Sequence, residues 1–195
     1  GGRLPGVPAG GPSLRLCSHA DAEAKAGQQE HREGGHQQFG QADVAAHEAG
    51  ARANAALKPF ARRIGPDPAS LQSCMIGGIA ANNASGMCCG TEQNSYQTLD
   101  SLRLLLAPRD RAESSRAIGL DTADATSREA FRGQCPDILN GLLNLRQEIV
   151  ADRELSGEIR RKYAIKNTVG YGLNSFLDFE DPIDILSHLL IGSEG

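Results

Sequence analysis

The chain has no tryptophan, and aromatic residues make up only 4% of its 195 residues. Its hydrophobic fraction is 39%, so few large side chains are present to build a core. No apolar run approaches the roughly 20 residues that a membrane-spanning helix needs. A secretory signal is also missing. The composition favours one ordinary soluble, cytoplasmic domain. Because the chain begins with Gly1 rather than methionine, we expect it to be a fragment.

The chain also lacks an excess of one charge and the cysteine spacing of a metal site. Its net charge of −4 offers no footprint for nucleic acid or for an anionic membrane. None of its five cysteines are spaced as C-x-x-C, so no zinc or iron–sulfur site is predicted. Adjacent Cys88 and Cys89 could form a redox pair, but free thiols in a reducing compartment are the favoured interpretation.

Residues 1–53 show little that would fold. The segment is rich in Gly, Ala, Gln, His and Arg, has almost no large apolar residue after Leu16, and has neither helical nor strand periodicity. We expect a low-complexity segment that is disordered, or that is read out of frame beside authentic sequence. Its histidines are irregularly spaced and predict no metal site. They are His19, His31, His36 and His47.

Residues 54–107 carry clearer local signals. A short helix through Leu57 is predicted to end at Pro59, and "GPDP" at 65–68 predicts a stiff turn. "TLDSLRLLLA" predicts a strand with a mostly buried face. The charged residues 108–119 are predicted to be an irregular insertion, where we would otherwise expect a tight hairpin.

Helical periodicity is strongest after Leu120. "PDILNGLLNLRQEIVAD" predicts an amphipathic helix, and a second helix through Leu155 and Ile159 ends in the basic residues 160–162. The apolar stripe of the first helix consists of Ile138, Leu139, Leu142, Leu145 and Ile149.

The sequence "EDPIDILSHLL" predicts a third helix with a well-marked start. Asp181 is placed at its N-cap, Pro182 at its first position and Asp184 in its first turn. His188 lies inside this helix, and we interpret it as a surface or satisfied histidine rather than a catalytic one.

The small-residue stretch "CMIGGIAANNASGMCCG" at 74–90 suggests a backbone that bends tightly or approaches something closely. Its glycines could adopt positive φ, and Asn82 or Asn83 could do so more cheaply than most residues. Inward-turned amides would then cradle an anion. The stretch matches neither G-x-G-x-x-G nor a G-K-[ST] loop, so a glycine-lined turn between strands stays the alternative. The glycines in question are Gly77, Gly78 and Gly86.

Three segments together resemble a known family. "IGPDPAS", "MIGGIAANNASGMCCG" and "RRKYAIKNTVGYGLNSFLDFEDPIDILSHLLIGSEG" are similar to the FAD-binding domain of FAD-linked oxidases of the vanillyl-alcohol oxidase and p-cresol methylhydroxylase superfamily. The nearest branch contains bacterial D-lactate dehydrogenases and related D-2-hydroxy-acid dehydrogenases. The resemblance implies an α+β fold: a partial FAD-binding domain of the p-cresol methylhydroxylase type over residues 54–195, preceded by a disordered or irregular N-terminal segment.

The resemblance also implies the site. FAD would be held largely by backbone amides, and the closing "GSEG" would begin a second flavin-contacting segment. Lys166, Gly170 and Tyr171 match a segment near the substrate, where the lysine could steer an anionic 2-hydroxy acid or offset a phosphate. The alternative places Lys166 with residues 160–162 at a solvated helix end. The implied cofactor-binding residues are Pro66, Asp67, Pro68, Ile76, Gly77, Gly78, Ala80, Asn82, Asn83, Ala84, Ser85, Gly86, Gly192, Ser193, Glu194 and Gly195.

The implied function is oxidation of D-lactate to pyruvate by hydride transfer to FAD. A D-2-hydroxyglutarate or glycolate oxidase relative is one alternative, and a truncated non-catalytic remnant is another. The family's upstream glycine-rich phosphate loop has no match in residues 1–53, and its substrate-acting histidines lie beyond the matched segments. No catalytic base is therefore named. A small 2-hydroxy acid is the expected partner, with no nucleic acid, an unassigned electron acceptor and possible peripheral membrane association of the full-length enzyme.

Overall fold

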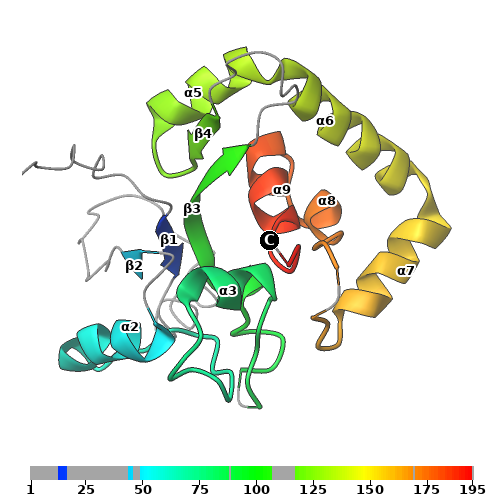
Figure 1. Cartoon of the computed structure of the whole chain (residues 1–195). Coiled ribbons are helices and arrows are strands. Elements are labelled where there is room, and N and C mark those ends of the chain that lie inside the picture. The colour runs from blue at the N-terminus through cyan, green and yellow to red at the C-terminus, as the bar shows by residue number, and fades with distance from the viewer. Residues whose placement is uncertain are drawn as a thin grey trace, which may run out of the picture.

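The computed structural model describes residues 49–87, 89–106, 117–168 and 170–194, together with the backbone of two short strands. In this part of the chain four strands form one antiparallel sheet in the order β2-β1-β3-β4 (Figure 1). Helices and loops complete the α+β arrangement that the sequence predicted. The strands are β1 (Ser13–Leu16), β2 (Val44–Ala45), β3 (Leu99–Leu106) and β4 (Ile118–Asp121).

β3 is the predicted strand with a buried face, and it forms the middle of the sheet between β1 and β4. β3 and β4 pair antiparallel from Arg103 opposite Asp121 to Leu106 opposite Ile118. The connection between them is longer than the tight hairpin that we expected. The predicted irregular insertion 108–119 is too long at its end, because Ile118 and Gly119 already belong to β4. Backbone pairing with Leu105 and Leu106 of β3 extends β4 backwards into that segment.

The helices surround the sheet on several sides. Figure 1 shows α5, α6 and α7 as an arc, with α8 and α9 inside it and α2 and α3 at the opposite end of β3. The described helices are α2 (Gly50–Leu57), the 3₁₀ turn η1 (Lys58–Phe60), α3 (Ile76–Ala81), α4 (Ser95–Thr98), α5 (Ala125–Gln134), α6 (Pro136–Ala151), α7 (Arg153–Tyr163), α8 (Ser175–Asp178) and α9 (Pro182–Leu189).

Two groups of buried side chains fill the structure on either side of β3. The first lies among α2, α3 and the start of β3, and includes Ile191. The second lies among α5, α6, α8, α9 and β4. Leu104 on β3 and Phe179 before α9 pack against both groups. The two cores are therefore continuous across the middle strand, which fixes α3 relative to α9.

α6 and α7 are the two helices that the periodicity predicted, but they bury less than expected. Leu139 and Leu142 on α6 are buried, whereas Ile138 and Leu145 are 42% and 48% exposed. α6 packs against α8 and α9 on the inside of the arc only. The apolar stripe of α6 is therefore wider than the part of the helix that α8 and α9 cover.

α9 begins as the sequence predicted. The Asp181 side chain accepts from the Ile183 amide, Pro182 is the first helical residue, and Asp184 lies in the first turn. Two arginines on α5 also bind this helix start. Arg132 donates to Asp181 at 2.5 Å and Arg128 donates to Asp184 at 2.8 Å. These ion pairs join α5 to α9.

The stretch around residue 80 differs from the predicted loop. Residues 76–81 form α3, and Ile76, Ile79 and Ala80 are buried in the first core group. Their spacing gives one buried helical face, so this part of the stretch serves packing. The bend follows α3, where Asn83 has a φ of 43°.

Candidate functional site

The three glycines named above do not have the predicted positive φ, although Gly90 at the end of the stretch does, at 53°. Gly77 and Gly78 lie inside α3, and Gly86 is not among the residues with positive φ. Only the asparagine part of that prediction is confirmed, at Asn83. Asparagine tolerates this region because its short polar side chain can bond locally. The prediction that these three glycines form a left-handed anion cradle is therefore wrong. The backbone path of residues 76–86 is set by helix α3 and the bend at Asn83.

Gly86 nevertheless supplies a close backbone approach. A Cβ built on Gly86 would lie 1.6 Å from the carbonyl oxygen of Asp67. Only glycine fits there, because no real side chain tolerates such a contact. This contact joins the "GPDP" turn to the end of the small-residue stretch, so two of the predicted cofactor-binding segments lie side by side.

The end of the chain joins the same place. The Gly192 amide donates to the carbonyl of Ala80 at 3.0 Å, and the Glu194 amide donates to the carbonyl of Ala81 at 2.7 Å. Gly192 has a φ of 87°, and a Cβ on it would lie 2.7 Å from the carbonyl oxygen of Gly170. Glycine is required there by both its conformation and its neighbour. The predicted "GSEG" segment is therefore anchored to the last turn of α3.

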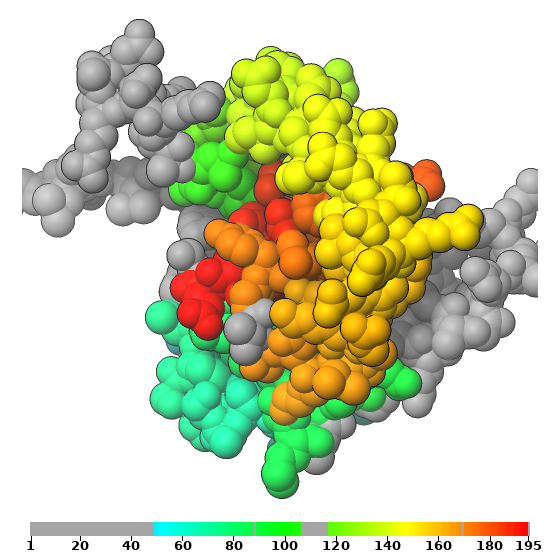
Figure 2. All heavy atoms as spheres, turned by 90° about the vertical axis from the view of Figure 1, so that its right-hand side faces the viewer, coloured from blue at the N-terminus to red at the C-terminus, as the bar shows by residue number. Residues whose placement is uncertain are grey.

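Residues 166–172 complete the assembly. The ammonium of Lys166 donates to the carbonyls of Ser85 and Gly86 at 3.0 and 3.2 Å. Asn83 lies between two elements, because its amide nitrogen donates to the Asn167 carbonyl at 3.2 Å and its oxygen accepts from the Tyr96 amide at 3.3 Å. Figure 2 shows the end of the chain, the segment after α7 and the residues after α3 on one face of the molecule.

A small hollow with a volume of about 30 Å³ lies where these segments meet. Its lining bears no charged side chain and is rich in amides and hydroxyls. Such a surface can hydrogen-bond an uncharged polar group, but it does not neutralise an anion. The lining residues are Asn83, Thr91, Asn94, Tyr96, Gln97, Tyr163, Ile165, Asn167, Gly170, Gly172, Asn174 and Ile191.

Three ring side chains cluster next to the hollow: Tyr96, which is buried and lines it, and the half-buried Phe179 and His188. His188 stacks on Phe179 with ring centroids 4.0 Å apart, and its ring is 5.1 Å from that of Tyr96. Burial lowers the pKa of His188, although Asp184 and Asp178 act in the opposite direction. Burial also raises the pKa of Tyr96, and its hydrogen bond to Asp178 adds to that rise. Both side chains are therefore neutral in the folded protein, and His188 is satisfied by the Asp184 carbonyl as predicted.

The predicted cofactor-binding residues divide into buried and accessible sets. Pro66, Ile76 and Ala80 are buried in the interior, and Gly86 and Gly192 are buried by their backbone contacts. These five residues therefore support the site through packing and backbone contacts and are not accessible to a ligand. The accessible or partly accessible ones are Asp67, Pro68, Gly77, Gly78, Asn82, Asn83, Ala84, Ser85, Ser193 and Glu194, and Gly195 lies outside the described residues.

Several features of the accessible set fit a flavin nucleotide. The amides of Gly77 and Gly78 lie in the first turn of α3, where a helix provides no backbone acceptor. A Cβ on Gly78 would meet nothing within 4 Å, so the surface there is open. The Ser85 hydroxyl is buried and has no hydrogen-bond partner in the part of the chain that the structure describes. A polar, phosphorylated ligand would satisfy such groups.

Sequence reasoning missed much of the lining of the hollow. Tyr96, Asn94 and Gln97 come from α4, and Asn174 from the turn before α8. One signal existed in the sequence, because "NSYQT" starts with an asparagine N-cap that accepts from the Gln97 amide. A helix of four residues is too short for periodicity to reveal.

Comparison with known proteins supports the cofactor. The family model described as "FAD binding domain" matches residues 35–110, which include α2, α3, α4 and β3. This match supports an FAD-binding domain of the oxidase family in that part of the chain, and the family binds FAD, as predicted. The match begins within the segment 1–53. No curated protein and no solved structure matches the chain. In the described residues no helix is both long and apolar enough to cross a membrane.

Proposed function

We propose that this chain is the FAD-binding portion of a flavin-dependent D-2-hydroxy-acid dehydrogenase, with D-lactate as the substrate. The observation that carries the proposal is the meeting of four predicted segments at one place. Residues 66–68, 76–86, 166–171 and 192–194 are far apart in the sequence, yet direct contacts connect them. A site built from distant segments by backbone contacts is suited to holding an extended ligand.

Different residues of the site would bind different parts of the ligand. The amides of Gly77 and Gly78 in the first turn of α3 and the hydroxyl of Ser85 would bind a phosphorylated group. The uncharged hollow beside Asn83 would hydrogen-bond a neutral polar part of the same ligand. When bound, FAD accepts a hydride from the substrate carbon, and the protein contributes binding and orientation. Tyr96 would contribute an uncharged ring to the lining, and His188 packs against that ring.

The substrate assignment rests on the resemblance to D-2-hydroxy-acid dehydrogenases. Lys166 was predicted to steer the substrate carboxylate, but its ammonium donates to two backbone carbonyls. Tyr171 is 54% exposed, and its carbonyl accepts from the Tyr163 hydroxyl. We name no catalytic base among the described residues. D-2-hydroxyglutarate and glycolate are the alternative substrates.

A flavin titration tests the proposal directly. Purified protein is titrated with FAD, and binding is followed by flavin fluorescence and by the visible absorbance of the separated protein. D-lactate is then added without oxygen, with L-lactate as the matched control and the two alternative acids in parallel. Bleaching of bound flavin by D-lactate alone supports the full proposal. If FAD binds but none of the acids bleaches it, FAD binding is supported and the dehydrogenase activity is refuted. If FAD does not bind, both parts of the proposal are refuted.

A further inference from the structure

We propose that Lys166 is a positioning residue, which fixes the orientation of the two peptide groups that follow Ser85 in the FAD site. This inference rests on the proposed function, because it assigns Lys166 a role in binding the same cofactor. It differs from the predicted role of this lysine as a cation facing the substrate.

The ammonium of Lys166 donates to two consecutive carbonyls, at 3.0 Å to Ser85 and 3.2 Å to Gly86. The lysine follows α7 in the sequence and contacts the residues after α3 through these two bonds. No ion pair of Lys166 occurs within the described part of the chain, so its ammonium serves these carbonyls. Hydrogen bonds from a charged donor are stronger than bonds between neutral groups.

This contact determines where the neighbouring amides point. In a trans peptide the C=O and N–H bonds are directed oppositely, and the described residues contain no cis peptide. The carbonyls of Ser85 and Gly86 face Lys166, so the amides of Gly86 and Met87 face away from it. No acceptor for these two amides lies within the described residues. Consecutive amides that face one way bind anionic groups such as a pyrophosphate.

Other contacts join the two segments independently of the Lys166 ammonium. Its neighbour Asn167 accepts from the Asn83 side chain through its carbonyl, at 3.2 Å. Gly86 is independently held against the Asp67 backbone. Removing only the ammonium therefore leaves both segments attached, and we expect the variant to fold. What it loses is the bias of the two peptide groups toward one orientation.

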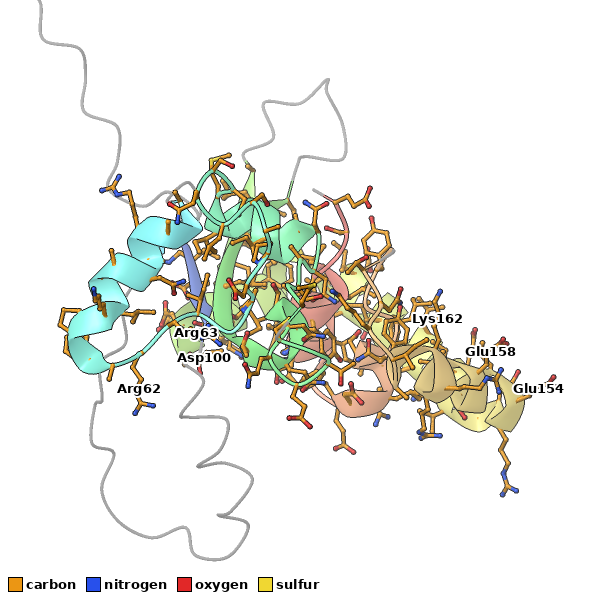
Figure 3. The ribbon with its side chains drawn as sticks, turned by 90° about the horizontal axis from the view of Figure 1, so that it is seen from below. Arg62, Arg63, Asp100, Glu154, Glu158 and Lys162 are labelled. Atoms are coloured by element: carbon orange, nitrogen blue, oxygen red, sulfur yellow. The ribbon has the colours of Figure 1, made fainter. Side chains whose placement is uncertain are left out.

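The test compares Lys166→Met with Lys162→Met. Lys162 lies four positions earlier in the last turn of α7, is exposed, and provides the same change of charge (Figure 3). Both proteins are titrated with FAD, and thermal unfolding reports their stability. We expect Lys166→Met to weaken FAD binding about tenfold or more, as for a hydrogen bond to a charged group. Lys162→Met should bind like the original chain, and Lys166→Arg should recover much of the affinity.

Hydrogen exchange of the free protein provides a readout that needs no cofactor. Within the peptide that covers residues 82–87, the amides of Asn82, Asn83 and Ala84 donate to carbonyls of α3. These protected amides should exchange faster in Lys166→Met than in Lys162→Met. Unchanged affinity in Lys166→Met, or an equal loss in both variants, would overturn the inference while leaving FAD binding itself established. If the original chain binds no FAD, the proposed function fails first, and unchanged exchange in Lys166→Met would then refute the positioning role as well.

Discussion

The Tyr96 hydroxyl donates a 2.7 Å hydrogen bond to the carboxylate of Asp178, which lies 82 positions further along the chain. Tyr96 belongs to α4 and lines the hollow, whereas Asp178 ends α8. Asn174 donates to the same carboxylate oxygen at 3.0 Å. This contact ties the residues after the small-residue stretch to the C-terminal helices, and so it couples the geometry of the site to the second core.

Replacing Tyr96 with phenylalanine should therefore destabilise the fold while keeping its packing. A hydrogen bond to a charged group contributes about 1.5–3 kcal/mol, and the exposed Asp178 recovers part of it from water. We expect a loss of about 1 kcal/mol in urea unfolding at pH 7. Tyr171→Phe is the control, because Tyr171 is 54% exposed. Equal stability of the two variants would contradict the assigned role of the bond.

Alkaline pH should act on the same group. Burial, with the bond to Asp178, raises the pKa of Tyr96 above its ordinary value of 10.0. The unfolded chain ionises there first, so the contribution of Tyr96 is complete below about pH 10 and is lost as the pH rises further. Tyr96→Phe should flatten this fall in unfolding free energy between pH 9 and about 11. A fall of the same slope in both proteins would show that Tyr96 does not cause it.

Acid should weaken the fold through His188. Burial lowers the pKa of His188 relative to 6.5, despite the opposing effects of Asp184 and Asp178. Its contribution is therefore complete above about pH 6.5 and is lost as the pH falls through the lower value of the folded state. We expect His188→Phe to be less sensitive than the original chain to a change from pH 7.5 to 5.5, as measured by urea midpoints. A matching acid response in both proteins would place the sensitive group elsewhere.

A pair of helical glycines separates stability from cofactor binding. Gly78 on α3 and Gly141 on α6 both have nothing within 4 Å of a built Cβ. Either one replaced with alanine should stabilise the chain by about 0.5–1 kcal/mol, because alanine has the higher helix propensity. Only Gly78→Ala should weaken FAD binding, by about tenfold, if the ligand lies against α3. Equal FAD affinity in the two variants would place the ligand away from that face.

The cap of α9 should show two separable contributions. Burial alone would raise the pKa of Asp181, but bonds from Arg132 and the Ile183 amide, with the charge of Arg128, lower it. Asp181→Asn keeps a capping side chain and loses the charge, whereas Asp181→Ala loses both. We expect the alanine variant to be about 1 kcal/mol less stable than the asparagine variant by urea unfolding. Two variants of equal stability would show that the ion pairs, and not the cap, dominate.

The sequence predicted the parts of this fold that repeat a simple pattern. β3, α6, α7 and the start of α9 were expected, because strand alternation, helical stripes and capping residues are local signals. α3 was not, because glycine and alanine combine low hydrophobicity with weak periodicity in a helix of six residues. Its burial depends on Ile76 and Ile79 meeting α2 and β3, which no local window reveals.

The candidate site was predicted in its segments and not in its contacts. The family resemblance indicated residues 66–68, 76–86 and 192–195, and three of the contacts among them use only backbone atoms. Backbone contacts leave no signature in residue identity except at Gly86 and Gly192, where a side chain would collide. The lysine that reaches Ser85 and Gly86 is separated from them by 81 and 80 positions, so its partners could not be read from spacing.

The contact between Gly86 and the Asp67 carbonyl restricts the choice of amino acid at one of the two positions much more than at the other. The contact uses the main chain at position 67. Within the described part of the chain, the Asp67 side chain forms only an exposed pair with Arg63 at 3.8 Å. Many amino acids can therefore occupy position 67 without disturbing the junction, whereas position 86 admits one. During evolution of this protein, substitutions would therefore accumulate at position 67, whereas glycine would be retained at position 86.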